Sequence, residues 1–203
     1  MKPHNDYFLT DRNDKNFLNY YWFEKGLSED DLQKVESQIK KDNIELDDGV
    51  IFADQENLDT IHKVRKSKIT WLQEEDEWQW LYNKFIDFTQ IANDNMWNCE
   101  LVGMTEKIQY SHYYSDGGHY NWHMDIGNGH AARRKISIAV QLSDPDDYEG
   151  GDFQFRMRAD ALTVPRSKGA VVLFPSWMLH RVTPVTKGLR KSLVAWVSGP
   201  AWK

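Results

Sequence analysis

The part of the chain after residue 100 consists of short apolar segments separated by turn-forming residues, and this pattern constrains the fold most. Glycine, proline and aspartate cluster between the segments, as in Asp116-Gly117-Gly118, Asp144-Pro145-Asp146 and Gly150-Gly151. Short strands at such spacing are typical of an all-β sandwich or barrel. The expected strands are Glu106–Tyr114, Tyr120–Asp125, Lys135–Leu142, Asp152–Met157, Gly169–Phe174, His180–Thr183 and Arg190–Ser198.

Apolar residues at helical spacing predict two helices in the first hundred residues. Ser28 can cap a helix whose apolar stripe includes Leu32 and Val35. A longer helix is expected from about Glu74 to Asn93, where large apolar side chains recur at intervals of three and four residues. The strands expected between the two helices are Gly49–Asp54 and Ser67–Leu72.

No internal repeat and no Pro/Gly/Ser-rich linker divides the 203 residues, so we expect a single domain over residues 1–203. About residues 1–100 would form a helical support, and about residues 101–203 would form a catalytic β core. The expected fold class is therefore α+β with a mainly β core.

The composition excludes several classes of protein. Aromatic residues make up 13% of the chain and include nine Trp, which is too many large apolar side chains for a disordered protein. The longest apolar run, Ala170–Phe174, is too short to cross a bilayer, and the first ten residues lack a signal-peptide pattern. We therefore expect a soluble, cytoplasmic protein without a membrane partner.

Charge and cysteine content restrict the partners and the site chemistry. The net charge of −6 argues against nucleic acid as a partner, because phosphate binding needs a basic surface. The single cysteine, Cys99, excludes an intrachain disulfide and a CxxC metal site. A chain without disulfides suits a reducing compartment.

The segment from Tyr120 to Asp125 carries the most informative pair of residues, His123 and Asp125. Side chains two residues apart on a strand point to the same face, so the imidazole and the carboxylate would project together. Such a pair suits Fe(II) or Mn(II), and with one further histidine it forms the facial triad of non-haem iron oxygenases. His-x-Asp alone is common, so the residues that accompany it decide its meaning.

Two residues further along the chain supply that context. His180 ends a predicted strand–turn–strand segment, which would place an imidazole at the mouth of a barrel. Arg190 begins an apolar strand, where a buried cation is costly unless it is paired. Because no acidic residue is near it in sequence, a bound carboxylate is an economical partner for the planar guanidinium. Ser192 shares the face of Arg190 and can donate a further hydrogen bond.

With these residues in place, the segment from Lys107 to Pro200 resembles the catalytic core of the prolyl 4-hydroxylase-like 2-oxoglutarate oxygenases, and most closely the PKHD-type hydroxylases. The resemblance covers nearly half of the chain and implies a double-stranded β-helix, or jelly-roll, barrel buttressed by the N-terminal helices. The matching segments are Tyr114–Asp125, Lys135–Asp144, Tyr148–Phe153, Gly169–Ser176 and His180–Pro200.

The resemblance also implies roles for single residues. The two histidines and the aspartate would bind Fe(II), and Arg190 would pair with the distal carboxylate of 2-oxoglutarate. Tyr114 matches a tyrosine that assists cosubstrate binding in related hydroxylases. Gln141 stands where some relatives have a second tyrosine that faces the same site.

The activity that the resemblance implies is hydroxylation of an unactivated carbon by a Fe(II)- and 2-oxoglutarate-dependent dioxygenase. The reaction would use O2, release succinate and CO2, and be supported by ascorbate. A prolyl residue of a protein or peptide is the first expected substrate, and a free amino acid or other small molecule is the alternative. A non-catalytic, cupin-like metal-binding protein is a further alternative, against which Arg190 argues because a pure metal binder needs no keto-acid anchor.

Four residues near the predicted ligands are open to two interpretations each. Arg133 and Arg134 follow the His-x-Asp segment and would either contact the substrate or form plain surface charge. Trp122 and Trp177 neighbour the ligand-bearing segments and would either stack on a substrate ring or pack within the scaffold.

Overall fold

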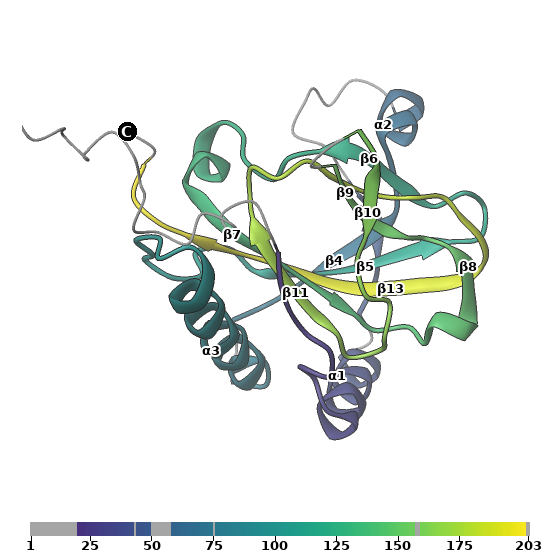
Figure 1. The fold of residues 1–203 in the computed structure, drawn as a ribbon. Coiled ribbons are helices and arrows are strands. Elements are labelled where there is room, and N and C mark those ends of the chain that lie inside the picture. The colour runs from purple at the N-terminus through teal and green to yellow at the C-terminus, as the bar shows by residue number, and fades with distance from the viewer. Residues whose placement is uncertain (1–19, 43, 50–57, 75, 157–158, 202–203) are drawn as a thin grey trace, which may run out of the picture.

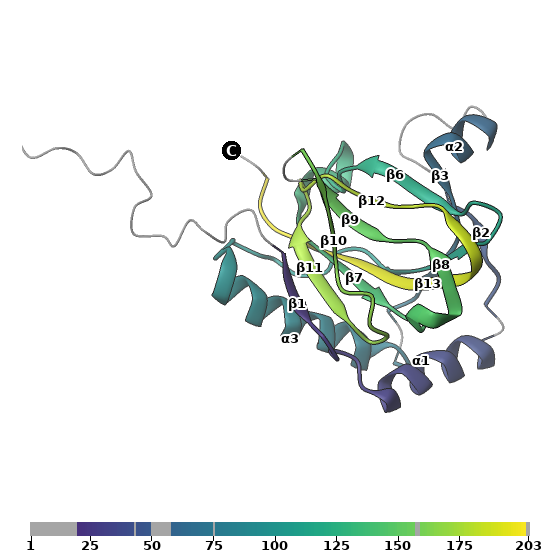
Figure 2. The ribbon, with the colours of Figure 1, turned by 45° about the vertical axis from the view of Figure 1, so that its right-hand side comes forward.

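The computed structural model describes residues 20–42, 44–49, 58–74, 76–156 and 159–201. Two antiparallel β-sheets lie face to face, and the helices α1 (Glu29–Lys41) and α3 (Gln79–Met96) cover the outer face of the larger sheet (Figures 1 and 2). The short helix α2 (Leu58–Val64) lies beside the smaller sheet. The expected mainly β core with N-terminal helical support is confirmed.

The larger sheet places the last long strand, β13, between β7 and β5. Its order is β1 (Tyr21–Phe23), β11 (Val171–Pro175), β7 (Arg134–Gln141), β13 (Val185–Ser198), β5 (Ile108–Tyr114), β4 (Lys68–Leu72) and β2 (Asp47–Asp48). A further short strand, β8 (Tyr148–Gly150), pairs with the first part of β13. Two turns of 3-10 helix, Gly129–Arg133 and Pro145–Asp147, flank β7.

The smaller sheet has the order β10 (Ala161–Thr163), β9 (Phe153–Arg156), β12 (His180–Val182), β6 (His119–His123) and β3 (Arg65–Lys66). The described strands thus form two sheets with free edges, and the expected jelly roll is confirmed, in a form in which the sheets do not close into a barrel. The opening follows from the edge strands β1, β2, β3 and β10, each of which pairs on one side only.

Helix α1 begins where the sequence predicted, because Ser28 and Asp31 form a reciprocal capping box. The Ser28 hydroxyl accepts from the Asp31 amide at 3.2 Å, and the Asp31 carboxylate accepts from the Ser28 amide at 2.9 Å. Helix α3 begins at Gln79, later than the expected Glu74, and Trp78 at its N-cap offers no side-chain hydrogen bond to the first turn.

Two hydrophobic cores lie on opposite faces of the larger sheet. Buried residues of α3, such as Leu81 and Phe85, pack in one cluster with Ile138 of β7. Ala139, the next residue of β7, belongs to the second cluster, which fills the space between the two sheets with Phe155 and other aromatic residues. Every residue of β7 is buried, since the strand has a covered surface on both sides.

Several elements differ from the sequence-based expectation. Strand β13 begins at Val185 rather than at Arg190, and the short elements β1, α2, β3, β8 and β10 were not expected. The expected strand Gly49–Asp54 lies outside the described residues except for Gly49, and β2 precedes it at Asp47–Asp48. Within the described ranges, no helix combines the length and the apolar character that crossing a bilayer requires.

Candidate functional site

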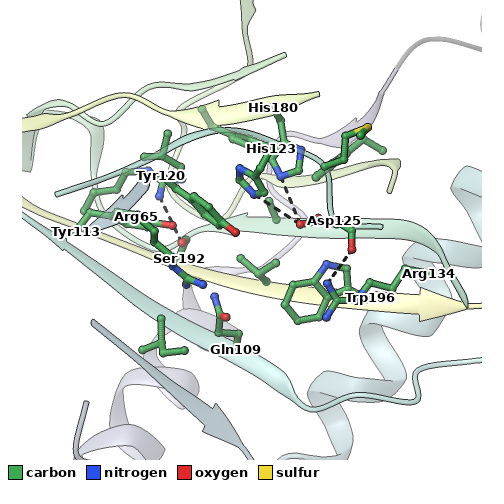
Figure 3. A pocket seen from close by; sticks show the side chains of 18 of the residues that line it. Arg65, Gln109, Tyr113, Tyr120, His123, Asp125, Arg134, His180, Ser192 and Trp196 are labelled. Atoms are coloured by element: carbon green, nitrogen blue, oxygen red, sulfur yellow. Dashed lines mark hydrogen bonds and ion pairs between the residues drawn. The ribbon is translucent and has the colours of Figure 1, made fainter. Parts of the chain in front are cut away.

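A cavity opens between the two sheets, and side chains from both sheets line it (Figure 3). The larger sheet contributes residues of β4, β5, β7, β11 and β13, and the smaller sheet contributes residues of β3, β6, β9 and β12. Most of the lining is apolar or aromatic, so the few charged groups stand in water-poor surroundings. The cavity therefore has the form of a small-molecule site, with a few convergent polar groups in an apolar wall.

His123, Asp125 and His180 converge at one side of this cavity. His123 ends β6 and His180 begins β12, and the two residues are directly paired across the smaller sheet. One Asp125 oxygen, Oδ1, lies 3.7 Å from His123 Nε2 and 3.6 Å from His180 Nε2. One ligand atom from each of the three residues lies within 4.8 Å of the other two, which is the spacing of a shared metal site.

The backbone orients both imidazole rings. The Nδ1 atom of His123 lies 2.7 Å from the carbonyl of Asn121, and Nδ1 of His180 lies 2.8 Å from the carbonyl of Met178. A carbonyl only accepts hydrogen bonds, so Nδ1 carries the proton and Nε2 presents its lone pair to the centre of the group. Burial, together with the neighbouring His180, lowers the pKa of His123 to about 3, which keeps the ring neutral.

The Asp125 carboxylate has two differently engaged oxygens. Oδ1 faces the imidazoles, whereas Oδ2 accepts a hydrogen bond from the Ser137 hydroxyl at 2.6 Å. Burial alone raises the pKa of Asp125, but the two neighbouring imidazoles, the Ser137 hydrogen bond and Arg134 outweigh it and hold the pKa below its usual value. The group is thus an ionised carboxylate beside two neutral imidazoles, a donor set that suits Fe(II) and leaves other coordination positions open.

Arg190 lies in the same cavity, with only 2% of its surface exposed. Its Nη2 donates to Gln141 Oε1 at 2.9 Å and its Nη1 to Ser192 Oγ at 3.4 Å. The guanidinium also stands over the ring of Tyr113, 5.2 Å from the centroid. These partners are all neutral, and no ion pair among the described residues includes Arg190, so a buried positive charge faces the cavity without a carboxylate from this part of the chain.

Comparison with known proteins agrees with this combination of a His-Asp-His group and a buried arginine. Residues 108–198 match the family model described as the 2OG-Fe(II) oxygenase superfamily. This part of the chain is thus similar to that superfamily. The similarity indicates Fe(II), 2-oxoglutarate and O2 as cofactor and cosubstrates, and His123, Asp125 and His180 can bind the iron.

Curated proteins that are similar to the same part of the chain are PKHD-type hydroxylases. One from Teredinibacter turnerae is 40% identical over 89 residues, which cover 41% of this chain and 39% of the relative. Another, from Parvibaculum lavamentivorans, is 39% identical over 90 residues, covering 41% of this chain and 40% of the relative. The matched region thus spans about two fifths of the length of these relatives.

Solved structures share the fold over most of the chain. A prolyl-4-hydroxylase from Pseudomonas putida superposes with a TM-score of 0.69 at 18% identity, covering 90% of this chain and 93% of the other. A prolyl hydroxylase from Trichoplax adhaerens, in complex with a hypoxia inducible factor peptide fragment, gives a TM-score of 0.75 at 17% identity. That match covers 92% of this chain and 86% of the other, and it shows that the two chains share a fold.

The structure does not bring Tyr114 to the cavity between the two sheets. Tyr114 is 40% exposed, and its hydroxyl bonds His112 Nδ1 at 3.1 Å on the other face of β5. Its neighbour Tyr113 is 3% exposed and lines the cavity beside Arg190. The correction follows from the alternation of side chains along a strand, which allows only one of two adjacent tyrosines to face inward.

The two arginines that follow the His-x-Asp segment have structural partners. Arg134 is 2% exposed, and its guanidinium forms a two-pronged ion pair with Glu106 and stacks on Trp196 at 3.8 Å. Arg133 is exposed and its Nε lies 3.3 Å from the Gly199 carbonyl. Arg134 therefore supports the cavity wall, where plain surface charge or direct substrate contact had been expected.

Trp122 lies on the outer face of the smaller sheet. Arg181 stands over its ring at 4.5 Å and Arg156 at 5.8 Å. Trp122 does not line the cavity, which favours the scaffold interpretation. Trp177 packs against the core between the two sheets and is not among the cavity-lining residues either.

Tyr120 is a cavity residue that the sequence did not single out. Its ring stacks on that of His123, with centroids 3.4 Å apart and planes 14° from parallel. Burial raises its pKa to about 12, so the phenol stays protonated. In a regular strand, Tyr120 and His123 would lie on opposite faces of the sheet, because they are three residues apart. The pairing of β6 with β12 shifts register between them, and this irregularity turns both rings toward the cavity. No pattern in the sequence marks this irregularity.

Proposed function

We propose that the protein is a Fe(II)- and 2-oxoglutarate-dependent dioxygenase that hydroxylates an unactivated carbon and releases succinate and CO2. In this proposal His123, Asp125 and His180 hold the iron. Arg190, with Gln141 and Ser192 beside it, binds the distal carboxylate of 2-oxoglutarate. The observation that carries the proposal is that a His-Asp-His group and a buried, carboxylate-free arginine open into one cavity.

Different groups of cavity residues would have different roles in such a reaction. Bound Fe(II) supplies the activation of O2, and the chain positions the reactants around it. The Nδ1 hydrogen bonds hold both imidazoles in the ligating tautomer, and the guanidinium orients a dicarboxylate with its keto end toward the metal ligands. The aromatic wall excludes bulk water, which protects a reactive centre from side reactions.

We propose a prolyl residue of a protein or peptide as the substrate. Support comes from the uncharged lining near the metal ligands, where Phe153, Phe174, Val182 and Val194 face the cavity. A prolyl ring in a peptide is uncharged and matches such a wall, whereas a free amino acid brings two charges that need partners. The solved prolyl hydroxylases of the same fold agree with this choice, and one of them holds a peptide.

Two conditions of the reaction belong to the same proposal. Ascorbate supports turnover by keeping the iron reduced, and a reducing, cytoplasmic location would serve the same end. The single cysteine of the chain is consistent with such a compartment.

The test is turnover by the purified protein with Fe(II), 2-oxoglutarate and ascorbate under air. We expect succinate release that rises when prolyl peptides are added, together with a peptide mass gain of one oxygen. Asp125→Ala should abolish both signals. Asp116→Ala removes an exposed aspartate from the turn after β5 and should leave both signals unchanged.

The outcomes separate the alternatives. If the wild type neither binds 2-oxoglutarate nor consumes it under oxygen, the oxygenase proposal fails. If free proline or another amino acid gains the oxygen while prolyl peptides do not, the enzyme class stands and the peptide substrate is wrong.

A further inference from the structure

A pair of buried hydroxyl groups lies directly behind the Asp125 carboxylate. Ser137 on β7 and Ser176, just after β11, are both 0% exposed. Ser137 Oγ lies 2.6 Å from Asp125 Oδ2 and 3.0 Å from Ser176 Oγ. The three side chains thus form one chain of hydrogen bonds that leads away from the cavity.

The direction of these hydrogen bonds follows from the chemistry of the groups. An ionised carboxylate only accepts, and each hydroxyl has a single hydrogen to donate. Ser137 must therefore donate to Asp125, and its hydroxyl also lies within hydrogen-bond distance of Ser176 Oγ. The contact with the charged oxygen is the shorter of the two, so the Ser137 hydrogen is directed mainly at Asp125.

The backbone around Asp125 is held by the same neighbours. The Ser176 carbonyl accepts from the Asp125 amide at 2.9 Å and from the Ile126 amide at 3.3 Å. Arg134 Nη1 donates to the Asp125 carbonyl at 3.0 Å. With its main chain anchored on both sides, Asp125 has little freedom to rotate its carboxylate away from Ser137.

We propose that the Ser137–Ser176 pair makes Asp125 a one-oxygen ligand. Oδ2 is occupied by the Ser137 hydroxyl, so that only Oδ1 is presented to the metal. A carboxylate that offered both oxygens would take a second coordination position, one that the keto acid or O2 requires. The two serines are therefore positioning residues that hold the coordination sphere open, and this inference rests on the proposed function.

The experiment measures metal binding rather than turnover. Apoprotein is titrated with Co(II), whose visible absorption reports the number and kind of ligands, and affinities are compared between variants. Ser137→Ala should weaken Co(II) binding about 10- to 100-fold, as expected when a partner of a ligating side chain is lost. It should also change the spectrum of the bound ion. Ser137→Thr keeps a hydroxyl on a strand that tolerates β-branched residues and should restore both.

Ser143→Ala is the matched control, because it removes another buried hydroxyl that is bonded far from the metal ligands. Ser143 Oγ donates to the Leu189 carbonyl at 2.9 Å and accepts from the Lys191 amide at 2.8 Å. This variant should bind Co(II) as the wild type does. If Ser137→Ala does not fold, Ser176→Ala tests the same chain from its far end and should shift affinity and spectrum in the same direction, by less.

Three outcomes would contradict the proposed role of Ser137 and Ser176. A Ser137→Ala variant with wild-type affinity and spectrum overturns the inference and leaves the proposed function standing. Reduced thermal stability with an unchanged Co(II) spectrum shows a merely structural role and overturns it as well. A wild type that binds no Co(II) overturns the proposed function, and the inference falls with it.

Discussion

Arg190 shows how one side chain can be prepared for an anionic ligand. Its two outer nitrogens are engaged by neutral oxygens of Gln141 and Ser192, and its Nε has no hydrogen-bond partner among the residues that the structure describes. Neutral oxygens orient the guanidinium without neutralising it, so the charge is left for a ligand. A lysine at this position would keep the charge but lose the planar, two-pronged geometry.

We predict that Arg190→Lys weakens 2-oxoglutarate binding about tenfold or more, since a hydrogen bond between charged groups contributes about 1.5–3 kcal/mol. Isothermal titration of 2-oxoglutarate into Mn(II)-loaded protein measures the effect. Arg181→Lys makes the same replacement on the outer face of the smaller sheet and should bind as the wild type does. Equal affinity in both variants would exclude Arg190 as the cosubstrate anchor.

His112 gives the protein a predictable response to acid. Burial, with a smaller effect from Lys191, lowers its pKa from 6.5 to about 4, and its ring nitrogens lie against the hydroxyls of Tyr110 and Tyr114. The folded protein therefore holds a neutral imidazole that the unfolded chain protonates below pH 6.5. The stabilisation is complete above pH 6.5 and is lost as pH falls toward 4.

We predict that the free energy of unfolding of the wild type falls more between pH 6.5 and pH 4 than that of His112→Gln, which cannot titrate in this range. Urea unfolding at several pH values in this interval measures the difference. Carboxylates titrate in both proteins, so their effect on the free energy of unfolding is the same in both and cancels in the comparison. Parallel pH profiles would show that His112 is protonated as easily in the folded chain as in the unfolded one.

At the scale of single elements, β5 shows what sequence alone could not decide. Tyr113 and Tyr114 are chemically alike, and β5 is buried on both faces for most of its length, so no polar alternation marks the inward side. The pairing with β13 settles the matter, since Arg190 lies opposite Tyr113. By contrast, His123 and Asp125 were predictable because their spacing already places two ligand types together.

The capping box of α1 provides a quantitative test of an element boundary. We predict that Ser28→Ala lowers the free energy of unfolding by about 1 kcal/mol, because the Asp31 amide loses its acceptor and the Asp31 carboxylate loses a donor hydroxyl. Ser37→Ala removes an exposed hydroxyl from the same helix and should be neutral or slightly stabilising. Chemical denaturation compares the two, and equal effects would mean that the cap contributes nothing.

The whole molecule is organised by its two hydrophobic cores, and they differ in their relation to the site. Phe85 lies in the core between α3 and the larger sheet, whereas Phe155 lies between the sheets and is paired with His180 in register. Both side chains are 0% exposed. Their removal should therefore cost similar stability while having different consequences for the metal ligands.

We predict that Phe85→Ala and Phe155→Ala each destabilise the protein by about 3–5 kcal/mol. Only Phe155→Ala should weaken Co(II) binding, because the ring centroid of Phe155 lies 6.5 Å from that of His180. Urea unfolding and Co(II) titration under folding conditions measure the two properties. Weakened metal binding in Phe85→Ala would show that packing in the core between α3 and the larger sheet also affects the metal ligands.

The sequence predicted the mainly β character and the order of most strands of the C-terminal half, because turn residues mark their ends. In the first hundred residues it predicted two helices and the strand that forms β4, but not the short strands β1 and β3. Arg65 of β3 lines the cavity from there. A two-residue strand has no recognisable period, so its place beside β6 is decided by tertiary pairing.

The central place of β13 also sets the order in which the site can be made on the ribosome. Strands β5 and β7 leave the exit tunnel first, and β13 must then enter between them. At about 5–20 residues per second, translating the intervening stretch takes on the order of seconds. During that interval the nascent chain has neither His180 nor Arg190 in place. The proposed site therefore becomes complete only after β13 has entered the larger sheet.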